Sequence, residues 1–132
     1  MESLIIHIGA SENHFGAFAE NCPGIYGAGD TVLECKENVM EGLRLFIENT
    51  EPTQLPDLLK GEYQIVYTYD TQSLLKYYGT IFTAPAMERL TGINQKQLHH
   101  YASGLRKPRA EQRKKIVDAF HKLGKELIAV TL

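Results

Sequence analysis

The chain has 132 residues, of which 43% are hydrophobic and 23% are charged, and its formal net charge is −2. That length suits one ordinary domain or two small ones that share an interface. The opening residues, MESLIIHIGA, have an acidic flank and only a short apolar run, which argues against a signal peptide and a membrane span, so we expect a globular cytoplasmic protein with no membrane partner.

The first half of the chain predicts three strands followed by a helix. Runs of β-forming residues at 4–8 and 14–20 flank the turn-rich segment GASEN, so we expect them to pair as an antiparallel hairpin. A third short strand is predicted at 25–29. Thr31 and Glu34 then have the T-x-x-E spacing of a capping box, and the apolar residues after them recur every three or four positions, which predicts a helix to about residue 49.

The segment that follows predicts a loop and a fourth strand. TEPTQLPDLLKG is interrupted by Pro52 and Pro56, which is typical of a loop. EYQIVYTY at 62–69 is rich in β-branched and aromatic residues and predicts the next strand. The first half therefore predicts the order βββαβ.

The second half changes to helical spacing throughout. Asp70, Thr83 and Asn94 can each cap a helix, over TQSLLKYY, APAMERL and QKQLHHYASGL respectively, and Gly92 ends the middle one. A fourth helix is predicted over AEQRKKIVDAFHKL. The closing residues ELIAVTL predict a short C-terminal strand, which is a candidate for pairing between two copies of the chain.

The charge reverses where the spacing changes. Residues 1–70 hold three Lys or Arg against twelve Asp or Glu, a net −9, whereas residues 71–132 hold eleven against four, a net +7. A charge difference this large favours two domains, 1–70 and 71–132, that bind partners of opposite charge. The alternative is that the two halves are solvated faces of one domain. The basic half is the candidate for binding nucleic acid.

The stretch TGINQKQLHHYASGLRKP at 91–108 predicts a helix-turn-helix. Its apolar residues keep helical spacing on either side of the turn glycine, so they hold the second helix against its neighbours. After that helix, Arg106, Lys107 and Arg109 stand where basic side chains would contact phosphates. The side chains left on the outer and N-terminal face, where the major groove would lie, are Gln95, Lys96, His99, His100 and Ser103.

Residues 71–123 resemble the helix-turn-helix of the phage-repressor (lambda and Cro type) proteins. In that family a small residue, often Ala, usually stands four positions before the turn glycine, and here the residue is Glu88. The resemblance implies that Gln95, Lys96 and His100 occupy base-reading positions, with Asn94, Arg106 and Lys107 near the DNA backbone. It rests on Thr91, Gly92, Ile93, Gln95, Leu98, Tyr101, Gly104 and Pro108.

The first half resembles the HicB antitoxin domain, a partial RNase H-like fold, through CPGIYGAGDTVLECKENV. The match rests on the Pro-Gly, Gly-Asp-Thr and following Glu of that family, here Pro23, Gly24, Gly29, Asp30, Thr31 and Glu34. The order of the two halves is that of HicB antitoxins with a C-terminal DNA-binding domain. This resemblance implies a partner, a small HicA-type RNA-cleaving toxin.

Two other functions compete with an antitoxin. A metal-dependent nuclease would need a carboxylate within the first strand, and LIIHI has none, so we expect no enzyme, no catalytic residue, no metal site and no cofactor. Cys22 and Cys35 lack the C-x-x-C spacing of a redox or zinc site and are predicted to pack in the core. A ligand-sensing regulator without a toxin partner is the alternative, and it would need a pocket with converging polar groups.

The sequence thus predicts an α+β protein with two domains. The first is a partial RNase H-like βββαβ domain, and the second is an all-α helix-turn-helix domain with a short C-terminal strand. We expect the first to bind and neutralise a HicA-type toxin and the second to repress the protein's own operon by binding double-stranded operator DNA. A single helix-turn-helix reads one half-site, so we also expect a homodimer or a higher homo-oligomer.

Overall fold

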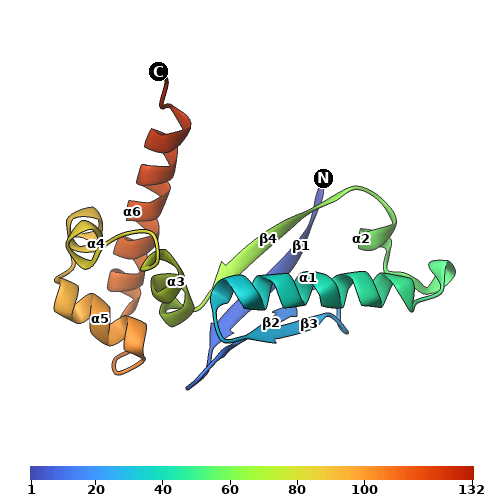
Figure 1. Cartoon of the computed structure of the whole chain (residues 1–132). Coiled ribbons are helices and arrows are strands. Elements are labelled where there is room, and N and C mark those ends of the chain that lie inside the picture. The colour runs from blue at the N-terminus through green and yellow to red at the C-terminus, as the bar shows by residue number, and fades with distance from the viewer. The chain divides into compact units, whose positions relative to one another are not determined.

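The computed structural model describes residues 1–132, and its fold is α+β with a four-stranded mixed sheet and six α-helices (Figure 1). The chain divides into two compact units, Met1–Ser73 (unit 1) and Leu74–Leu132 (unit 2). The predicted domain boundary after Asp70 lies just before this division, which falls within a helix. No helix combines the length and the apolar composition that crossing a membrane would require.

The sheet of unit 1 has the strand order β3-β2-β1-β4. β1 pairs antiparallel with β2, with Ile8 opposite Ala17, which confirms the predicted hairpin, and it pairs in parallel with β4, with Ile6 opposite Tyr67. β2 pairs antiparallel with β3. The strands are β1 (Glu2–Ala10), β2 (Phe15–Ala19), β3 (Tyr26–Gly29) and β4 (Tyr63–Tyr69).

The helix α1 (Val32–Glu48) lies along one face of this sheet (Figure 1). Thr31 caps the helix, as its place in the predicted capping box requires, because the backbone N–H of Glu34 donates to the Thr31 hydroxyl at 3.0 Å. The core lies between the helix and the sheet, since alternate residues of each strand face the helix. Its fully buried side chains include Leu4, Ile6, Ile8, Ile25, Cys22, Cys35 and Val39.

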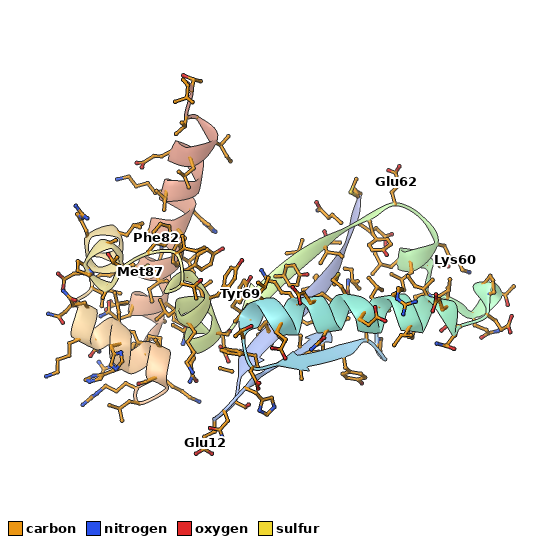
Figure 2. The ribbon with its side chains drawn as sticks, in the orientation of Figure 1. Glu12, Lys60, Glu62, Tyr69, Phe82 and Met87 are labelled. Atoms are coloured by element: carbon orange, nitrogen blue, oxygen red, sulfur yellow. The ribbon has the colours of Figure 1, made fainter.

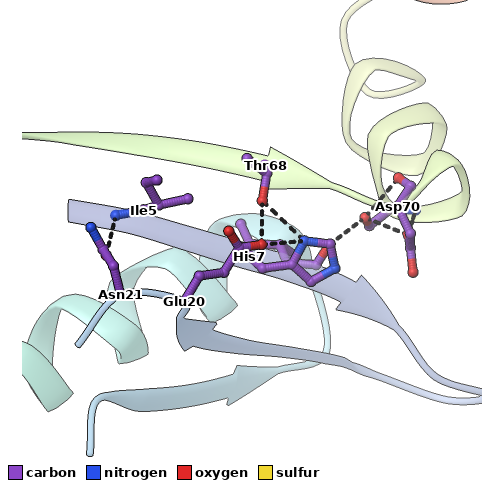
Figure 3. A network of polar contacts seen from close by, with 8 residues as sticks. Ile5, His7, Glu20, Asn21, Thr68 and Asp70 are labelled. Carbon is purple, nitrogen blue, oxygen red and sulfur yellow. Dashed lines mark hydrogen bonds and ion pairs between the residues drawn. The ribbon is translucent and has the colours of Figure 1, made fainter. Parts of the chain in front are cut away.

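The opposite face of the sheet is open within unit 1. The register places His7, Phe18 and Tyr26 next to one another across three strands on this face, and Tyr26 is 67% exposed. The Nδ1 atom of His7 lies 3.0 Å from the Thr68 hydroxyl on the neighbouring strand (Figure 3). The face therefore combines exposed aromatic rings with a small polar network.

The end of β4 is fastened to β1 by one carboxylate (Figure 3). Asp70 caps the next helix, as predicted, because it accepts the backbone N–H of Ser73 at 2.8 Å. Its other oxygen accepts the backbone N–H of Ala10 at 2.9 Å. The Ser73 hydroxyl, which is fully buried, lies 2.7 Å from Asp70 and 3.0 Å from the carbonyl oxygen of Ile8.

The predicted loop at 50–61 is partly helical, so that prediction was incomplete. A 3₁₀ turn, η1 (Pro52–Gln54), and a single helical turn, α2 (Asp57–Lys60), occupy it. Both prolines stand at the start of a turn, where a missing backbone N–H has no cost. The second turn buries Leu59, so proline here marks helix starts as well as breaks.

Unit 2 is all helical. Its core consists of Leu75, Met87, Ile93, Leu98, Tyr101 and Ile116, against which Phe82 and Phe120 also pack. Two of these side chains, Phe82 and Met87, are labelled in Figure 2. The helices are α3 (Thr71–Tyr78, which begins in unit 1), α4 (Ala84–Thr91), α5 (Gln95–Ser103) and α6 (Ala110–Ile128).

The predicted C-terminal strand is wrong. Residues 126–128 form the last turn of α6, and residues 129–132 have no regular structure. The physical reason is that Phe120, Leu123 and Leu127 continue the helical spacing, and extending an existing helix needs no new nucleus. A strand at this position has no neighbouring strand to accept its hydrogen bonds, because all strands of the sheet belong to unit 1.

Candidate nucleic-acid interface

The turn between α4 and α5 is short and strongly specified. Gly92 has φ 73° and ends α4, as predicted. The buried Thr91 hydroxyl donates to the carbonyl oxygen of Met87 at 2.8 Å and accepts the backbone N–H of Ile93 at 3.1 Å. Ile93 in turn enters the core. These contacts hold the direction in which α5 leaves the turn.

Two side chains satisfy the N-terminus of α5. The amide oxygen of Asn94 accepts the backbone N–H of Lys96 at 2.8 Å, which is the predicted cap. The carboxylate of Glu88, on α4, accepts the backbone N–H of Gln95 at 2.8 Å. The residue that departs from the phage-repressor pattern therefore forms a second cap and links the two helices.

Helix α5 buries one face and exposes the other. Leu98 and Tyr101 are buried, and the helix ends at Gly104, which has φ 81°. Of the residues predicted on the outer face of α5, Gln95, Lys96, His99 and Ser103 are exposed, and Asn94 is exposed at the cap of the helix. Four side chains able to bind base edges or phosphates thus share the exposed part of a short helix.

His100 differs from the other predicted base-reading residues. Its side chain is partly buried, and its Nδ1 atom is buried without a hydrogen-bond partner. His100 follows Lys96 by one helical turn, so it lies next to the side of α5 that exposes Gln95, Lys96 and His99 and not on the side of the buried Leu98 and Tyr101. His100 therefore lies on the α5 helix beside the predicted face, with only part of its ring accessible.

A polar hollow lies after α5, between its C-terminal part and the start of α6. The predicted phosphate-binding residues Arg106, Lys107 and Arg109 all line it and are exposed. None of their side chains forms an ion pair, so their charge is available to an anion. The other lining residues are Gln97, Tyr101 and Gln112.

Sequence reasoning missed Gln97 and Gln112 as part of this group. The side-chain amide of Gln97 donates to the Tyr101 hydroxyl at 2.8 Å. Gln112 stands in the first turn of α6, one turn of chain away from the basic loop. Both amides lie next to the three basic residues because the end of α5 packs near the start of α6. A sequence motif therefore does not indicate that they belong to this group.

A second, apolar hollow of about 190 Å³ lies among α3, α4 and α5. Two of its lining residues, Gln95 and His99, belong to the predicted base-reading face. The apolar part of its lining includes Leu75, Phe82, Met87, Leu98 and Ala102. A small molecule bound here would contact both the core and the exposed face of α5.

The predicted motif of unit 1 lies at the two ends of α1. A Cβ on Gly24 would lie 3.0 Å from the ring of Phe46, near the end of the helix. A Cβ on Gly29 would lie 2.6 Å from the backbone nitrogen of Cys35, in its first turns. The residues at 30, 31 and 34 form the exposed start of the helix, with Thr31 as its cap. Close packing and capping thus account for much of the motif.

The outward face of α1 is acidic. Glu34, Glu37, Glu41 and Glu48 are all exposed and lie opposite the buried stripe. Arg44 forms ion pairs with Glu41 and with Glu48, and its hydrogen bond lowers the pKa of the Glu41 carboxyl below the ordinary value. Glu34 and Glu37 form no ion pair, so this ridge keeps net negative charge along its first half.

The cysteines and other potential metal ligands are dispersed. Cys22 and Cys35 are free thiols with no exposed surface, as predicted, and burial raises the pKa of each. No three His, Cys, Asp or Glu side chains lie together in a group that could hold a metal ion.

Comparison with known proteins adds no assignment. No protein-family model matches the chain, and neither a curated protein nor a solved structure matches it.

Proposed function

We propose that the protein is a HicB-family antitoxin that neutralises a small HicA-type RNA-cleaving toxin and represses its own operon. In this proposal, unit 1 is a partial RNase H-like domain that binds the toxin. Unit 2 is a phage-repressor type helix-turn-helix domain that binds operator DNA. The observation that supports it most is the pairing, in one chain, of a strongly acidic α/β unit with a basic helical unit.

DNA binding by unit 2 is supported by the exposed face of α5. Gln95 and Lys96 stand in its first turn, the part of a recognition helix that enters the major groove, and both are exposed. Amide and ammonium groups hydrogen-bond adenine and guanine edges. The unpaired cations of the polar hollow follow the helix, where they would contact phosphates and fix its register.

Toxin binding by unit 1 is supported by the acidic ridge of α1. A protein that cleaves RNA must attract a polyanion, so its RNA-binding surface is expected to be basic. Exposed carboxylates such as Glu34 and Glu37, which lack ionic partners, complement such a surface and accelerate its capture. The antitoxin itself is proposed to be a binding protein of the cytoplasm, without catalytic activity.

The proposal is tested with two purified probes and the full chain. The first is a HicA-type toxin encoded beside this gene, assayed for cleavage of an RNA transcript. The second is the DNA upstream of the gene, compared with random DNA of equal length. We expect the chain to stop cleavage at equimolar ratio and to prefer the upstream DNA. Full toxin activity in the presence of excess chain would exclude the antitoxin function.

A matched pair of variants locates the toxin site. Glu37→Lys reverses one charge on the ridge, and Glu12→Lys makes the same change in the β1–β2 connection. Both are exposed. We expect Glu37→Lys to weaken toxin binding at least tenfold and Glu12→Lys to change it much less. Equal effects of the two variants would exclude the ridge as the site.

A ligand-sensing regulator is the second candidate, and the apolar hollow favours it. A small apolar molecule among α3, α4 and α5 would touch Gln95 and His99 and alter their freedom to bind DNA. This candidate requires DNA binding without any toxin. If the chain binds its upstream DNA yet fails to inhibit the adjacent toxin, the regulator replaces the antitoxin as the better assignment.

A further inference from the structure

The polar hollow between the end of α5 and the start of α6 is larger than a contact with one DNA phosphate requires. Its volume is about 520 Å³, which is within the range of sites that hold a whole small molecule. Three cations without ionic partners, Arg106, Lys107 and Arg109, line it. A phosphate of duplex DNA brings only one negative charge, so a single backbone contact would leave most of this positive charge unpaired.

A buried hydroxyl in the wall of the hollow has a donor to spare. Tyr101 is 4% exposed, and it lines the hollow. Its hydroxyl oxygen accepts the side-chain amide of Gln97 at 2.8 Å, and the hydroxyl proton is given to no acceptor of the chain. Because a phenol both accepts and donates, this proton is left for an acceptor that enters the hollow. A phosphate oxygen is such an acceptor.

The two amides of the hollow supply a different chemistry from the cations. Gln97 donates through its side-chain nitrogen, so its oxygen remains an acceptor. Gln112, which is also partly buried, offers both a donor and an acceptor. A phosphate has no N–H group for an amide oxygen, whereas the edge of a nucleobase presents donors and acceptors side by side. The lining therefore suits a molecule with one polyanionic part and one part that resembles a base.

The start of α6 adds to the positive potential of the hollow. Arg109 is the N-cap of this 19-residue helix, and no side chain caps it. The free N–H groups at the start of a helix favour a nearby anion. This contribution supplements the three cations and does not by itself define the site.

We propose that the polar hollow binds a free nucleoside triphosphate. Its linked phosphates lie among the three cations and the Tyr101 hydroxyl, and its base lies against the amides of Gln97 and Gln112. A chain of linked phosphates brings several charges into one small volume, which is what three converging cations require. The same cations are proposed to contact the DNA backbone, so nucleotide and DNA exclude each other. This last consequence rests on the proposed function, whereas binding of the nucleotide does not.

The test is isothermal titration calorimetry of the full chain without DNA or Mg²⁺, with ATP and separately with GTP, at about 0.15 M salt. We expect saturable binding of one nucleotide per chain, and roughly tenfold weaker binding for Arg109→Ala. The matched control is Lys122→Ala, which removes an exposed cation of the same helix outside the hollow and should change nothing. No saturable binding of either nucleotide, or equal effects of the two variants, would overturn the proposal.

Two simpler anions test whether the hollow selects a nucleotide. Sulfate at the same concentration and ionic strength should bind much more weakly, because it has no linked phosphates. Tripolyphosphate should bind more weakly than the better nucleotide, and Gln112→Leu should remove that difference, because the leucine side chain can bind no base edge. Sulfate or tripolyphosphate that binds as tightly as both nucleotides would show a site for anions in general and overturn the proposal.

Release of labelled upstream DNA separates this proposal from the proposed function. We expect the nucleotide that binds to displace the DNA, and sodium chloride of equal ionic strength to displace much less. If the chain binds nucleotide but does not prefer its upstream DNA, the operator function fails and the nucleotide site stands. If the chain prefers that DNA but binds no nucleotide, the hollow serves the DNA backbone alone and the present proposal fails.

Discussion

The carboxylate of Glu88 on α4 accepts the backbone N–H of Gln95, the first residue of α5, at 2.8 Å. The contact joins the two helices on either side of the turn and satisfies one of the free N–H groups at a helix start. It also fixes the residue that we propose reads a base. A residue that departs from the phage-repressor pattern thus has a structural function that a small side chain could not replace.

Removal of this carboxylate should weaken unit 2. We expect Glu88→Ala to lower the free energy of unfolding by about 1 kcal/mol, because Gln95 loses its intramolecular acceptor. Glu88→Gln keeps an acceptor oxygen and should lose less. Urea unfolding followed by circular dichroism measures both, with the exposed neighbour change Arg89→Ala as a control. A more stable Glu88→Ala variant would show that close helix packing matters more than the cap.

Substitutions of base-reading and of phosphate-binding residues should have different effects on DNA binding when it is measured at several salt concentrations. We expect Gln95→Ala and Lys96→Ala each to reduce the preference for upstream over random DNA by about 1 to 3 kcal/mol. Lys107→Ala should weaken both DNAs alike and reduce the salt slope by about one per subunit, since it would lose only a phosphate contact.

None of these three changes should alter toxin capture, because all of them lie in unit 2. The measurement is fluorescence anisotropy with labelled upstream and random DNA at several salt concentrations. An unchanged preference in both Gln95→Ala and Lys96→Ala would mean that α5 is not the reading helix.

Asp70 should matter to the stability of unit 1 more than its position after a strand suggests. It accepts hydrogen bonds from Ala10, from the Ser73 backbone and from the Ser73 hydroxyl. We expect Asp70→Ala to cost about 2 to 3 kcal/mol, because it removes a helix cap and leaves donors near the buried Ser73 unpaired. The control is Asp57→Ala, whose carboxylate is 99% exposed and should cost less than about 0.5 kcal/mol.

The buried thiols predict a loss of stability at alkaline pH. Burial raises the pKa of Cys22 and of Cys35 above the ordinary value, so both stay protonated in the folded chain after they would ionise in the unfolded one. Their contribution is complete below the unfolded pKa of about 8.5 and decreases as pH rises above it. The midpoint of urea unfolding should therefore fall more between pH 7 and pH 9.5 for the wild type than for a Cys22→Ala/Cys35→Ala variant.

Much of the secondary structure could be predicted because it depends on neighbours in the chain. The caps at Thr31, Thr83 and Asn94 each form within three residues of the helix they start. The hairpin of β1 and β2 follows from one turn and two β-rich runs. Composition alone also distinguishes an acidic half from a basic half, because the net charge of a segment does not depend on how it folds.

Contacts between distant residues were decided by the tertiary structure alone. β4 pairs with β1 rather than with β3, the strand before its helix, and adjacency in a sheet depends on which faces can be buried together. Glu88 meets Gln95, and Gln97 meets the basic loop, only because α4, α5 and α6 pack at particular angles. Residues 126–128 are helical because an amphipathic helix was already present to extend, whereas a strand needs a partner that the local sequence cannot supply.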